Sequence, residues 1–327
     1  MQALRGPVWC DRNKARFSTF WTRKVTRHKT NRLSGRARAP AKHKNTPDSP
    51  PRPNAPAGAR REEPRAARNI ESEKIRPSAP KFRHAGSGVA VLYGFHAVRE
   101  AVREAVRVQR RKILDIYATE AAAQRLQGEI AHAGLSLHIV TAEDLARRLG
   151  AGAVHQGLML EALPLEPLDL SSIVSQSGIV LVLDQITDPH NAGAILRTAA
   201  AFGVDALVMT ERHAPEMAGV AAKAASGGLE HVAIVRVVNL ARALEHLGDM
   251  GYLRLGLDSD AQTSLAKVEL RRPIALVLGG EGKGLRRLSR ENCDVLVRLD
   301  MPGAIKSLNV SNACAVALTM LHAGLAG

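Results

Sequence analysis

Short apolar runs alternate with segments of helical periodicity along two stretches of this 327-residue chain. In the first stretch Val98, Ala101, Val102 and Ala105 recur at intervals of three and four, which indicates a helix with one apolar face. The strands predicted there are residues 89–93, 112–119, 136–140 and 158–162. The helices predicted between them are residues 94–108, 121–133 and 142–149. We therefore expect a small α/β domain over residues 89–163.

The alternation starts again at residue 178 and continues through the rest of the chain. The predicted strands are residues 179–183, 206–209, 232–237, 252–257, 274–278 and 295–299. The predicted helices are residues 191–202, 215–225, 240–247, 285–291 and 310–323. Strands that are apolar throughout are typical of a parallel sheet with helices on both faces. We expect such a domain over residues 178–327, joined to the first by a Pro- and Ser-containing linker at residues 164–177.

The net charge of +15 is not spread evenly along the chain. Residues 1–85 hold 22 basic and 6 acidic residues, whereas residues 86–327 hold 24 basic and 25 acidic residues. This distribution excludes a uniformly basic, histone-like protein. Residues 1–85 have no apolar pattern that could form a core, so we predict a disordered basic tail. Its charge favours a flexible, salt-sensitive tether for RNA.

The cysteines and apolar runs narrow the cellular location. Cys10, Cys293 and Cys314 show neither metal-ligand spacing nor a disulfide pattern, so we expect no structural metal and a reducing compartment. No apolar run is long enough for a membrane span, and the N-terminus lacks a secretory core. We expect a cytoplasmic protein. The alternative is a mitochondrial one, if the basic N-terminus is a transit segment.

The loop after the first strand of the second domain carries polar residues at a helix start. Pro189 ends the extended path, and Asn191 can cap the helix that follows. Arg197 lies nearly two turns further on, and the small residues 192–194 leave room for a close neighbour. The plain alternative is a capped helix with a solvated arginine.

A second loop has four glycines within residues 279–284, with Glu281 among them. Such a loop lets the backbone approach a ligand closely. A phosphate-binding P-loop is excluded because Lys283 is followed by glycine rather than Ser or Thr. A dinucleotide fingerprint is disfavoured because the glycines come late in the domain with the wrong spacing. A glycine turn without a ligand is the remaining alternative.

A third loop, residues 300–312, joins the last predicted strand to the last helix. Pro302 and Gly303 predict a turn, and Ser307, Asn309 and Ser311 gather before the helix. Ordinary N-capping accounts for one of these three side chains but not for all.

Together, and in this order, the three loops resemble the SpoU/TrmH family of RNA 2′-O-ribose methyltransferases, part of the SPOUT superfamily. Residues 191–197, 278–284 and 301–311 carry the resemblance. Residues 155–157 also resemble the family segment that precedes the linker. The first domain then resembles a ribosomal-protein-like substrate-binding domain, closest to the subgroup that methylates a guanosine of 23S rRNA.

This resemblance implies a SPOUT-type parallel sheet with a C-terminal trefoil knot, a homodimer, an RNA substrate and S-adenosyl-L-methionine as cofactor. It implies catalytic roles for Arg197, Asn191, Glu281, Ser307 and Asn309. It implies cofactor contacts from Leu278, Gly279, Gly280, Leu299 and Leu308. Because arginine stays protonated in nearly all proteins, we expect Arg197 to orient the target phosphate and stabilise a developing alkoxide. A deprotonated Arg197 acting as the base is the proposal associated with the family.

Two basic runs are predicted to contact RNA, with a solvated surface as the alternative for each. They contain Arg107, Arg110 and Arg111 in the first domain and Arg286 and Arg287 beside the glycine-rich loop. Other readings stay open: a tRNA substrate, or a non-catalytic RNA-binding or ribosome-assembly factor on the same fold. A nucleotide-dependent α/β enzyme is disfavoured by the two failed fingerprints.

Overall fold

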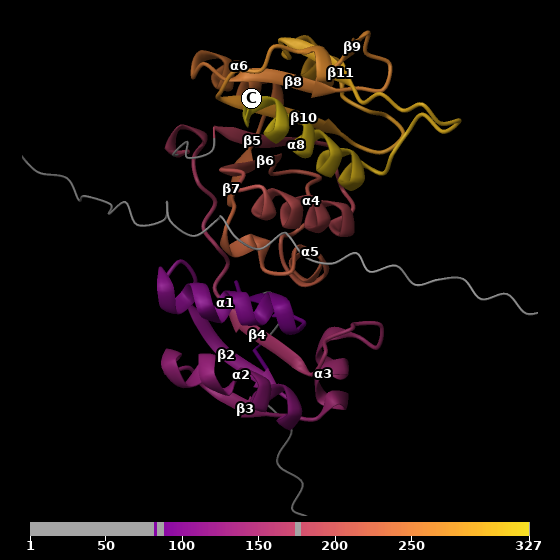
Figure 1. Cartoon of the computed structure of the whole chain (residues 1–327). Coiled ribbons are helices and arrows are strands. Elements are labelled where there is room, and N and C mark those ends of the chain that lie inside the picture. Colours follow the sequence, from indigo (N-terminus) through magenta and orange to yellow (C-terminus); the bar gives the residue numbers. More distant parts are fainter. Residues whose placement is uncertain (1–81, 84–87, 174–177, 327) are drawn as a thin grey trace, which may run out of the picture. The chain divides into compact units, whose positions relative to one another are not determined.

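The computed structural model of the chain describes residues 82–83, 88–173 and 178–326 (Figure 1). The rest of the predicted basic tail and part of the predicted linker lie outside the described residues. Two residues that we assigned to the tail contact the first domain. The ring centroid of Phe82 lies 4.9 Å from that of Tyr117, and Arg83 Nη2 donates to Asp115 Oδ2 at 2.8 Å.

The first domain contains every strand and helix predicted for it, and no bound shifts by more than one residue. Its sheet has the strand order β1-β4-β2-β3, in which only β2 and β3 run parallel. The strands are β1 (Ala90–Tyr93), β2 (Ile113–Ala118), β3 (Leu137–Ile139) and β4 (Leu158–Ala162). The helices are α1 (Phe95–Arg107), α2 (Glu120–Ala133) and α3 (Ala142–Leu149).

The local sequence explains these elements. On α1 the predicted apolar face buries Val98, Ala101 and Val102 completely. At α3 the Thr141 side chain accepts from the Asp144 backbone N–H, and the Asp144 carboxylate accepts from the Thr141 N–H. This reciprocal capping box fixes where α3 begins.

The second domain has a seven-stranded sheet with the order β7-β6-β5-β10-β8-β11-β9, parallel at every pairing. Its strands are β5 (Ile179–Asp184), β6 (Ala206–Thr210), β7 (Ala233–Val237), β8 (Leu253–Leu257), β9 (Thr263–Ser264), β10 (Ile274–Gly279) and β11 (Val295–Arg298). Its α-helices are α4 (Pro189–Ala201), α5 (Gly219–Ala225), α6 (Leu240–Asp249), α7 (Arg287–Glu291) and α8 (Val310–Ala326). Short 3₁₀ turns are η1 (Leu170–Ser172), η2 (Gly228–Glu230) and η3 (Leu265–Lys267).

Both faces of this sheet are buried, as predicted from its apolar strands. Along β5, Leu181 and Leu183 join a core cluster that contains residues of α4 and α8. The alternate residues Val180 and Val182 join a second cluster that contains residues of α6. Helices therefore cover both faces of the sheet, and the loops at the strand ends are the part of the domain that is free to differ in sequence and carry function.

The differences from the prediction that have a clear local cause are at β9, α5 and α7. The strand β9 was missed because two residues at a sheet edge give no pattern. The helix α5 begins at Gly219 rather than residue 215, because Ala218 is fully extended. The helix α7 begins at Arg287 rather than residue 285, because Leu285 is buried in the core and Arg286 is extended.

Two arginines predicted to contact RNA instead connect the two domains. Arg111 is 5% exposed, and its Nε donates to the buried Glu230 carboxylate at 2.9 Å. Burial raises the pKa of the Glu230 carboxyl, and the Arg111 guanidinium opposes this shift. Arg110 donates to the carbonyl oxygens of Glu230 and Val232 at 2.9 and 3.0 Å. Arg111 therefore presents almost no surface to RNA in this structure, Arg110 has a structural partner for its guanidinium, and the RNA contacts predicted for both stay predictions.

Membrane insertion finds no support in the described helices. None of them is both long enough and apolar enough to cross a bilayer.

The helices α4 and α5 touch at a glycine. A Cβ added at Gly193 would lie 2.4 Å from the carbonyl oxygen of Ala221 and 2.6 Å from the Cβ of Ala224. The helix-forming disadvantage of glycine is therefore outweighed here by the close approach of two backbones.

We predict opposite effects for two helical glycine substitutions. Gly193→Ala should lower the free energy of unfolding by about 1–3 kcal/mol through overpacking of α4 on α5. The matched control is Gly128→Ala on α2, where an added Cβ meets nothing within 4 Å. The control should raise stability by up to about 1 kcal/mol through helix propensity. Urea unfolding of both variants measures this, and equal effects would contradict the close-approach argument.

Candidate active site

The carboxyl ends of β5, β8, β10 and β11 meet at one edge of the sheet, as parallel neighbours must. The loops that follow β8, β10 and β11 enclose a cavity of about 280 Å³. All five residues predicted to contact a cofactor line it: Leu278, Gly279, Gly280, Leu299 and Leu308. Two of the predicted catalytic residues, Glu281 and Ser307, line it as well.

The glycine-rich loop folds back on itself beside this cavity. The Gly284 N–H donates to the Gly280 carbonyl oxygen at 3.0 Å. A Cβ at Gly279 would lie 2.2 Å from the Gly284 carbonyl carbon, so no larger residue fits there without moving the loop. The loop therefore presents its backbone to the cavity, as its sequence predicted.

A buried carboxylate holds the far end of the same loop. Asp184, the last residue of β5, is completely buried. It accepts the Arg286 backbone N–H at 2.9 Å and the Arg286 Nε–H at 2.6 Å. This pair explains why Arg286 is not helical. It also gives the side chain a structural role, and because the side chain is 45% exposed, its predicted RNA contact stays a prediction.

Three predicted catalytic residues form a hydrogen-bonded triangle from three loops. Glu281 Oε1 accepts from Asn191 Nδ2 and from Asn309 Nδ2, both at 2.8 Å. Asn309 Nδ2 also donates to Asn191 Oδ1 at 3.0 Å. The Asn309 Oδ1 in turn accepts from the Ser311 N–H and hydroxyl, which caps α8. The start of α4, the glycine-rich loop and the start of α8 are thereby fixed to one another.

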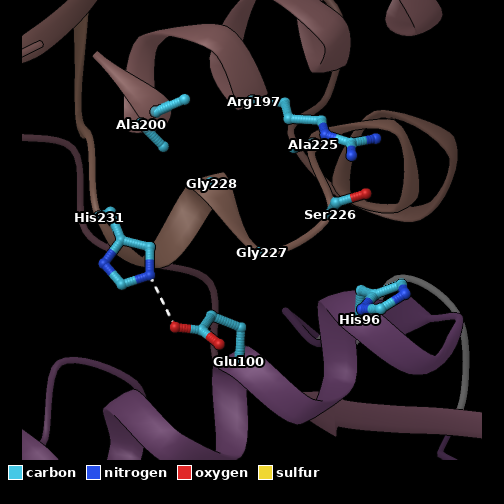
Figure 2. Close-up of a pocket in the computed structure, with 10 residues that line it drawn as sticks. His96, Glu100, Arg197, Ala200, Ala225, Ser226, Gly227, Gly228 and His231 are labelled. Atoms are coloured by element: carbon cyan, nitrogen blue, oxygen red, sulfur yellow. Dashed lines mark hydrogen bonds and ion pairs between the residues drawn. The ribbon is translucent and has the colours of Figure 1, made fainter. Parts of the chain in front are cut away.

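Arg197 does not line this cavity. It lies exposed on α4 in a second pocket of about 510 Å³ (Figure 2). The other side chains with polar groups there are His96, Glu100, Ser226 and His231. Across the part of the chain that the structure describes, Arg197 makes no ion pair. One chain therefore brings together four of the five predicted catalytic residues, and Arg197 stands apart.

Sequence reasoning missed part of the cavity wall. Leu257, Asp258 and Ser259 follow β8, and Met301 and Lys306 belong to the third loop. Asp258 is 8% exposed and pairs with Arg290 at 2.7 Å. A signal was present, because an acidic and polar run directly follows an apolar strand. Its use required knowing that β8 lies beside β10.

The two remaining arginines of the predicted RNA surface are more exposed. The Arg107 side chain donates two hydrogen bonds of 2.8 Å to the Glu104 carboxylate and is 66% exposed. This pairing holds the pKa of the Glu104 carboxyl below its ordinary value. Arg287 pairs with Glu291 at 2.6 Å and is 77% exposed. Both can still reach a phosphate, so their RNA contact stays a prediction.

The two described cysteines are poor nucleophiles. Burial raises the pKa of the Cys293 and Cys314 thiols to about 12. Both side chains are therefore neutral thiols at physiological pH, and reactive cysteines are thiolates. Covalent cysteine chemistry does not fit this site.

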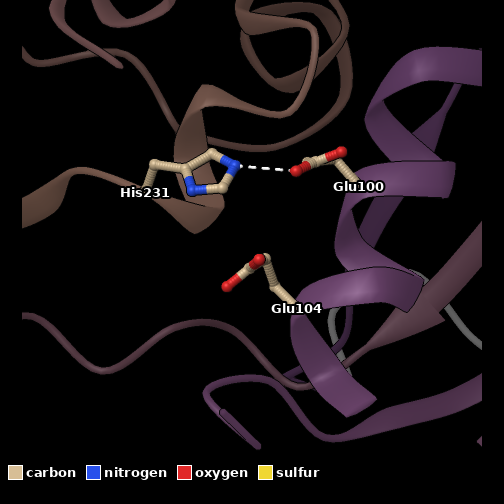
Figure 3. A group of neighbouring side chains, drawn as sticks. All are labelled: Glu100, Glu104 and His231. Atoms are coloured by element: carbon tan, nitrogen blue, oxygen red, sulfur yellow. Dashed lines mark hydrogen bonds and ion pairs between the residues drawn. The ribbon is translucent and has the colours of Figure 1, made fainter. Parts of the chain in front are cut away.

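One side-chain group at the second pocket has the composition of a metal site. Ligand atoms of Glu100, Glu104 and His231 lie within 4.8 Å of one another (Figure 3). Arg107 already occupies the Glu104 carboxylate, and His231 Nε2 lies 2.9 Å from Glu100 Oε1. Because protein cations and a hydrogen bond account for these groups, we assign them no metal.

Two family models match the chain, one over each of its two domains. Residues 178–319 match the model of the SpoU rRNA methylase family. Residues 91–168 match the model for RNA 2′-O ribose methyltransferase substrate binding. The 23S rRNA (guanosine-2′-O-)-methyltransferase RlmB of Pasteurella multocida is 36% identical over 237 residues, covering 69% of this chain and 95% of that protein. RlmB of Xylella fastidiosa strain 9a5c is 42% identical over 191 residues, covering 57% of this chain and 76% of that protein.

Solved structures support the fold at lower identity. The SpoU methyltransferase AviRb from Streptomyces viridochromogenes gives a TM-score of 0.61 at 20% identity, covering 73% of this chain and 91% of that one. An AdoMet-bound rRNA methyltransferase from Sinorhizobium meliloti gives 0.62 at 18% identity, covering 73% and 88%. These likenesses extend over both domains of the described chain.

Two adjacent arginines should respond differently to truncation. Arg286→Ala leaves the buried Asp184 carboxylate with only a backbone N–H, and we expect a loss of about 2 kcal/mol in unfolding free energy. Arg287→Ala removes a solvent-exposed pair and should change stability by less than about 0.5 kcal/mol. Chemical denaturation of the two variants tests the assignment. Equal stabilities would mean that Arg286 does not anchor the loop.

Proposed function

Because the chain belongs to the SpoU rRNA methylase family, we propose that it transfers a methyl group to a ribose 2′-hydroxyl of RNA. The proposed acceptor is a guanosine of 23S rRNA, in line with the names of the relatives that span both domains. The proposed methyl donor is S-adenosyl-L-methionine. The observation that carries the proposal is the convergence of three sequence-distant loops around one cavity at the sheet edge.

The chemistry of the cavity wall suits this cofactor. Leu278, Leu299 and Leu308 provide apolar surface, and Gly279 and Gly280 expose backbone groups that can read the edge of an adenine. Asp258, in the loop after β8, and Lys306, in the third loop, also line the cavity and add polar groups to its wall. When bound, S-adenosyl-L-methionine supplies a methyl group activated by a sulfonium centre.

The residues of the chain then have separable tasks. The triangle of Asn191, Glu281 and Asn309 holds the loops in place before any ligand arrives, which lowers the entropy cost of orienting the reactants. Ser307 offers a hydroxyl at the cavity. Arg197 provides a cation that orients the target phosphate and stabilises charge on the attacking 2′-oxygen.

The position of Arg197 supports a homodimer in which active sites are shared. Within one chain this side chain lies in a pocket that has no residue in common with the cofactor cavity. Apolar side chains on α8 and in the loop before it are exposed, among them Val316, Ile305 and Leu308. We propose that two copies associate there, so that Arg197 of one copy serves the cavity of the other.

We also propose that the third loop and α8 complete the trefoil knot implied by the family, and that the protein acts in the cytoplasm.

Methyl-donor binding gives the first test. Calorimetry should detect S-adenosyl-L-methionine binding to the wild-type chain. Gly279→Ala should weaken it at least about tenfold, because the Cβ displaces the cavity loop. The matched control Gly303→Ala adds a Cβ that meets nothing within 4 Å and should bind normally.

Ribose-methylation mapping of large-subunit rRNA with and without the protein then identifies the nucleotide. The absence of both binding and a mapped position would overturn the methyltransferase proposal in favour of a non-catalytic RNA-binding factor.

Mixing two inactive variants tests the shared site. Arg197→Ala should abolish methyl transfer and leave cofactor affinity nearly intact, whereas Gly279→Ala should lose the cofactor. After subunit exchange, a mixed dimer pairs an intact cavity with an intact Arg197, and statistics predict about a quarter of wild-type activity. Analytical ultracentrifugation confirms the dimer in each sample. No recovery of activity in exchanged dimers would place Arg197 in the site of its own chain.

A further inference from the structure

Two consecutive glycines bring a carboxylate of the first domain and Arg197 of the second to the same pocket. A Cβ added at Gly227 would lie 2.5 Å from the Cβ of Glu100 on α1. A Cβ added at Gly228 would lie 3.3 Å from the Cα of Arg197 on α4. The glycine pair is therefore sandwiched between these two helices, with Glu100 and Arg197 on either side of it, as Figure 2 shows.

The Glu100 carboxylate is held in position but keeps capacity for a ligand. His231 Nε2 lies 2.9 Å from its Oε1, and Arg103 Nη1 lies 3.9 Å from its Oε2. The side chain is 25% exposed and lines the pocket. A carboxylate has about four lone-pair sites, so it can accept further hydrogen bonds from a bound group.

The pocket has the size and polarity of a nucleotide site. Its volume of about 510 Å³ lies within the usual range for small-molecule pockets. Arg197 provides a cation for a phosphate on one side, and Glu100 provides acceptors on the other. The exposed imidazole of His96, on α1 like Glu100, adds a flat surface to the pocket lining.

We infer that Glu100 selects the base of the target nucleotide by accepting hydrogen bonds from N1–H and the N2 amino group of guanine. This inference rests on the proposed function, because it places the base of the nucleotide whose ribose Arg197 orients. Among the four RNA bases, guanine alone offers two adjacent donors on its Watson–Crick edge, and a single carboxylate can accept both. Adenine, cytosine and uracil each place an acceptor next to the donor, which a carboxylate repels.

The inference gives the first domain a task in the reaction. Glu100 belongs to α1, whereas the proposed reacting groups belong to the second domain. Buried Arg111 and exposed Arg110 follow α1 and donate to Glu230, the last residue of η2, and to Val232 just after it, which joins the end of α1 to the second domain. Guanine selection therefore depends on docking of the first domain against η2.

A matched set of variants and RNAs tests this. The RNAs carry guanosine or inosine at the single position that wild-type protein methylates, and inosine lacks only the N2 amino group. Wild-type protein should methylate guanosine about tenfold faster than inosine, the value of one good base-edge contact. Glu100→Gln retains the shape of the side chain but loses an acceptor, so its guanosine-to-inosine rate ratio should fall close to one.

Glu129→Gln is the control. Glu129 Oε1 accepts from the same Arg103 at 3.0 Å but does not line the pocket, so this variant should keep the wild-type ratio. Because each ratio compares two RNAs with one protein, a folding defect cancels. An unchanged ratio in Glu100→Gln, or no guanosine preference in the wild type, would overturn the inference. Failure of the wild type to methylate either RNA would instead refute the proposed function.

Discussion

The backbone of Gly279 lies against that of Gly284 so closely that the missing Cβ would be 2.2 Å from a carbonyl carbon. The cavity at the sheet edge depends on this contact, because the contact folds the glycine-rich loop back on itself beside the cavity. Asp184 and Arg286 fix the end of the loop, and Glu281 joins its tip to α4 and α8. The site is thus arranged before a ligand binds, as catalysis by positioning requires.

Much of this arrangement could be predicted from the sequence. The apolar strands gave a parallel sheet, and parallel strands place their following loops at one edge. The three loops could therefore be joined into one site, and the predicted catalytic residues other than Arg197 now lie around one cavity or in one triangle. The wall formed by Asp258 and Ser259 was missed because strand order is not a local property. The pattern of β8 does not reveal that β10 lies between it and β5.

The arginines show a different limit of sequence reasoning. A basic run has the same appearance whether its side chains face solvent or a buried acid far along the chain. Arg111 pairs with Glu230, and Arg286 pairs with Asp184. The partners lie more than 100 residues apart in the sequence, too far for a local pattern to reveal them. A buried guanidinium requires a partner, so each pair stabilises a particular packing of segments at the expense of free surface charge.

Arg197 differs from these arginines, because no salt bridge of the described residues includes it and its side chain is exposed beside a pocket. Several other arginines of the two domains are paired with carboxylates or carbonyl groups, including Arg107, Arg110 and Arg290. An exposed arginine that makes no ion pair and lies beside a pocket is available to a phosphate. It can bind the phosphate without first breaking an ion pair. The opposite side of that pocket is a carboxylate, which repels phosphates. A ligand must therefore enter with its phosphate toward α4 and its donors toward α1, so charge alone sets the orientation of a nucleotide before shape is considered.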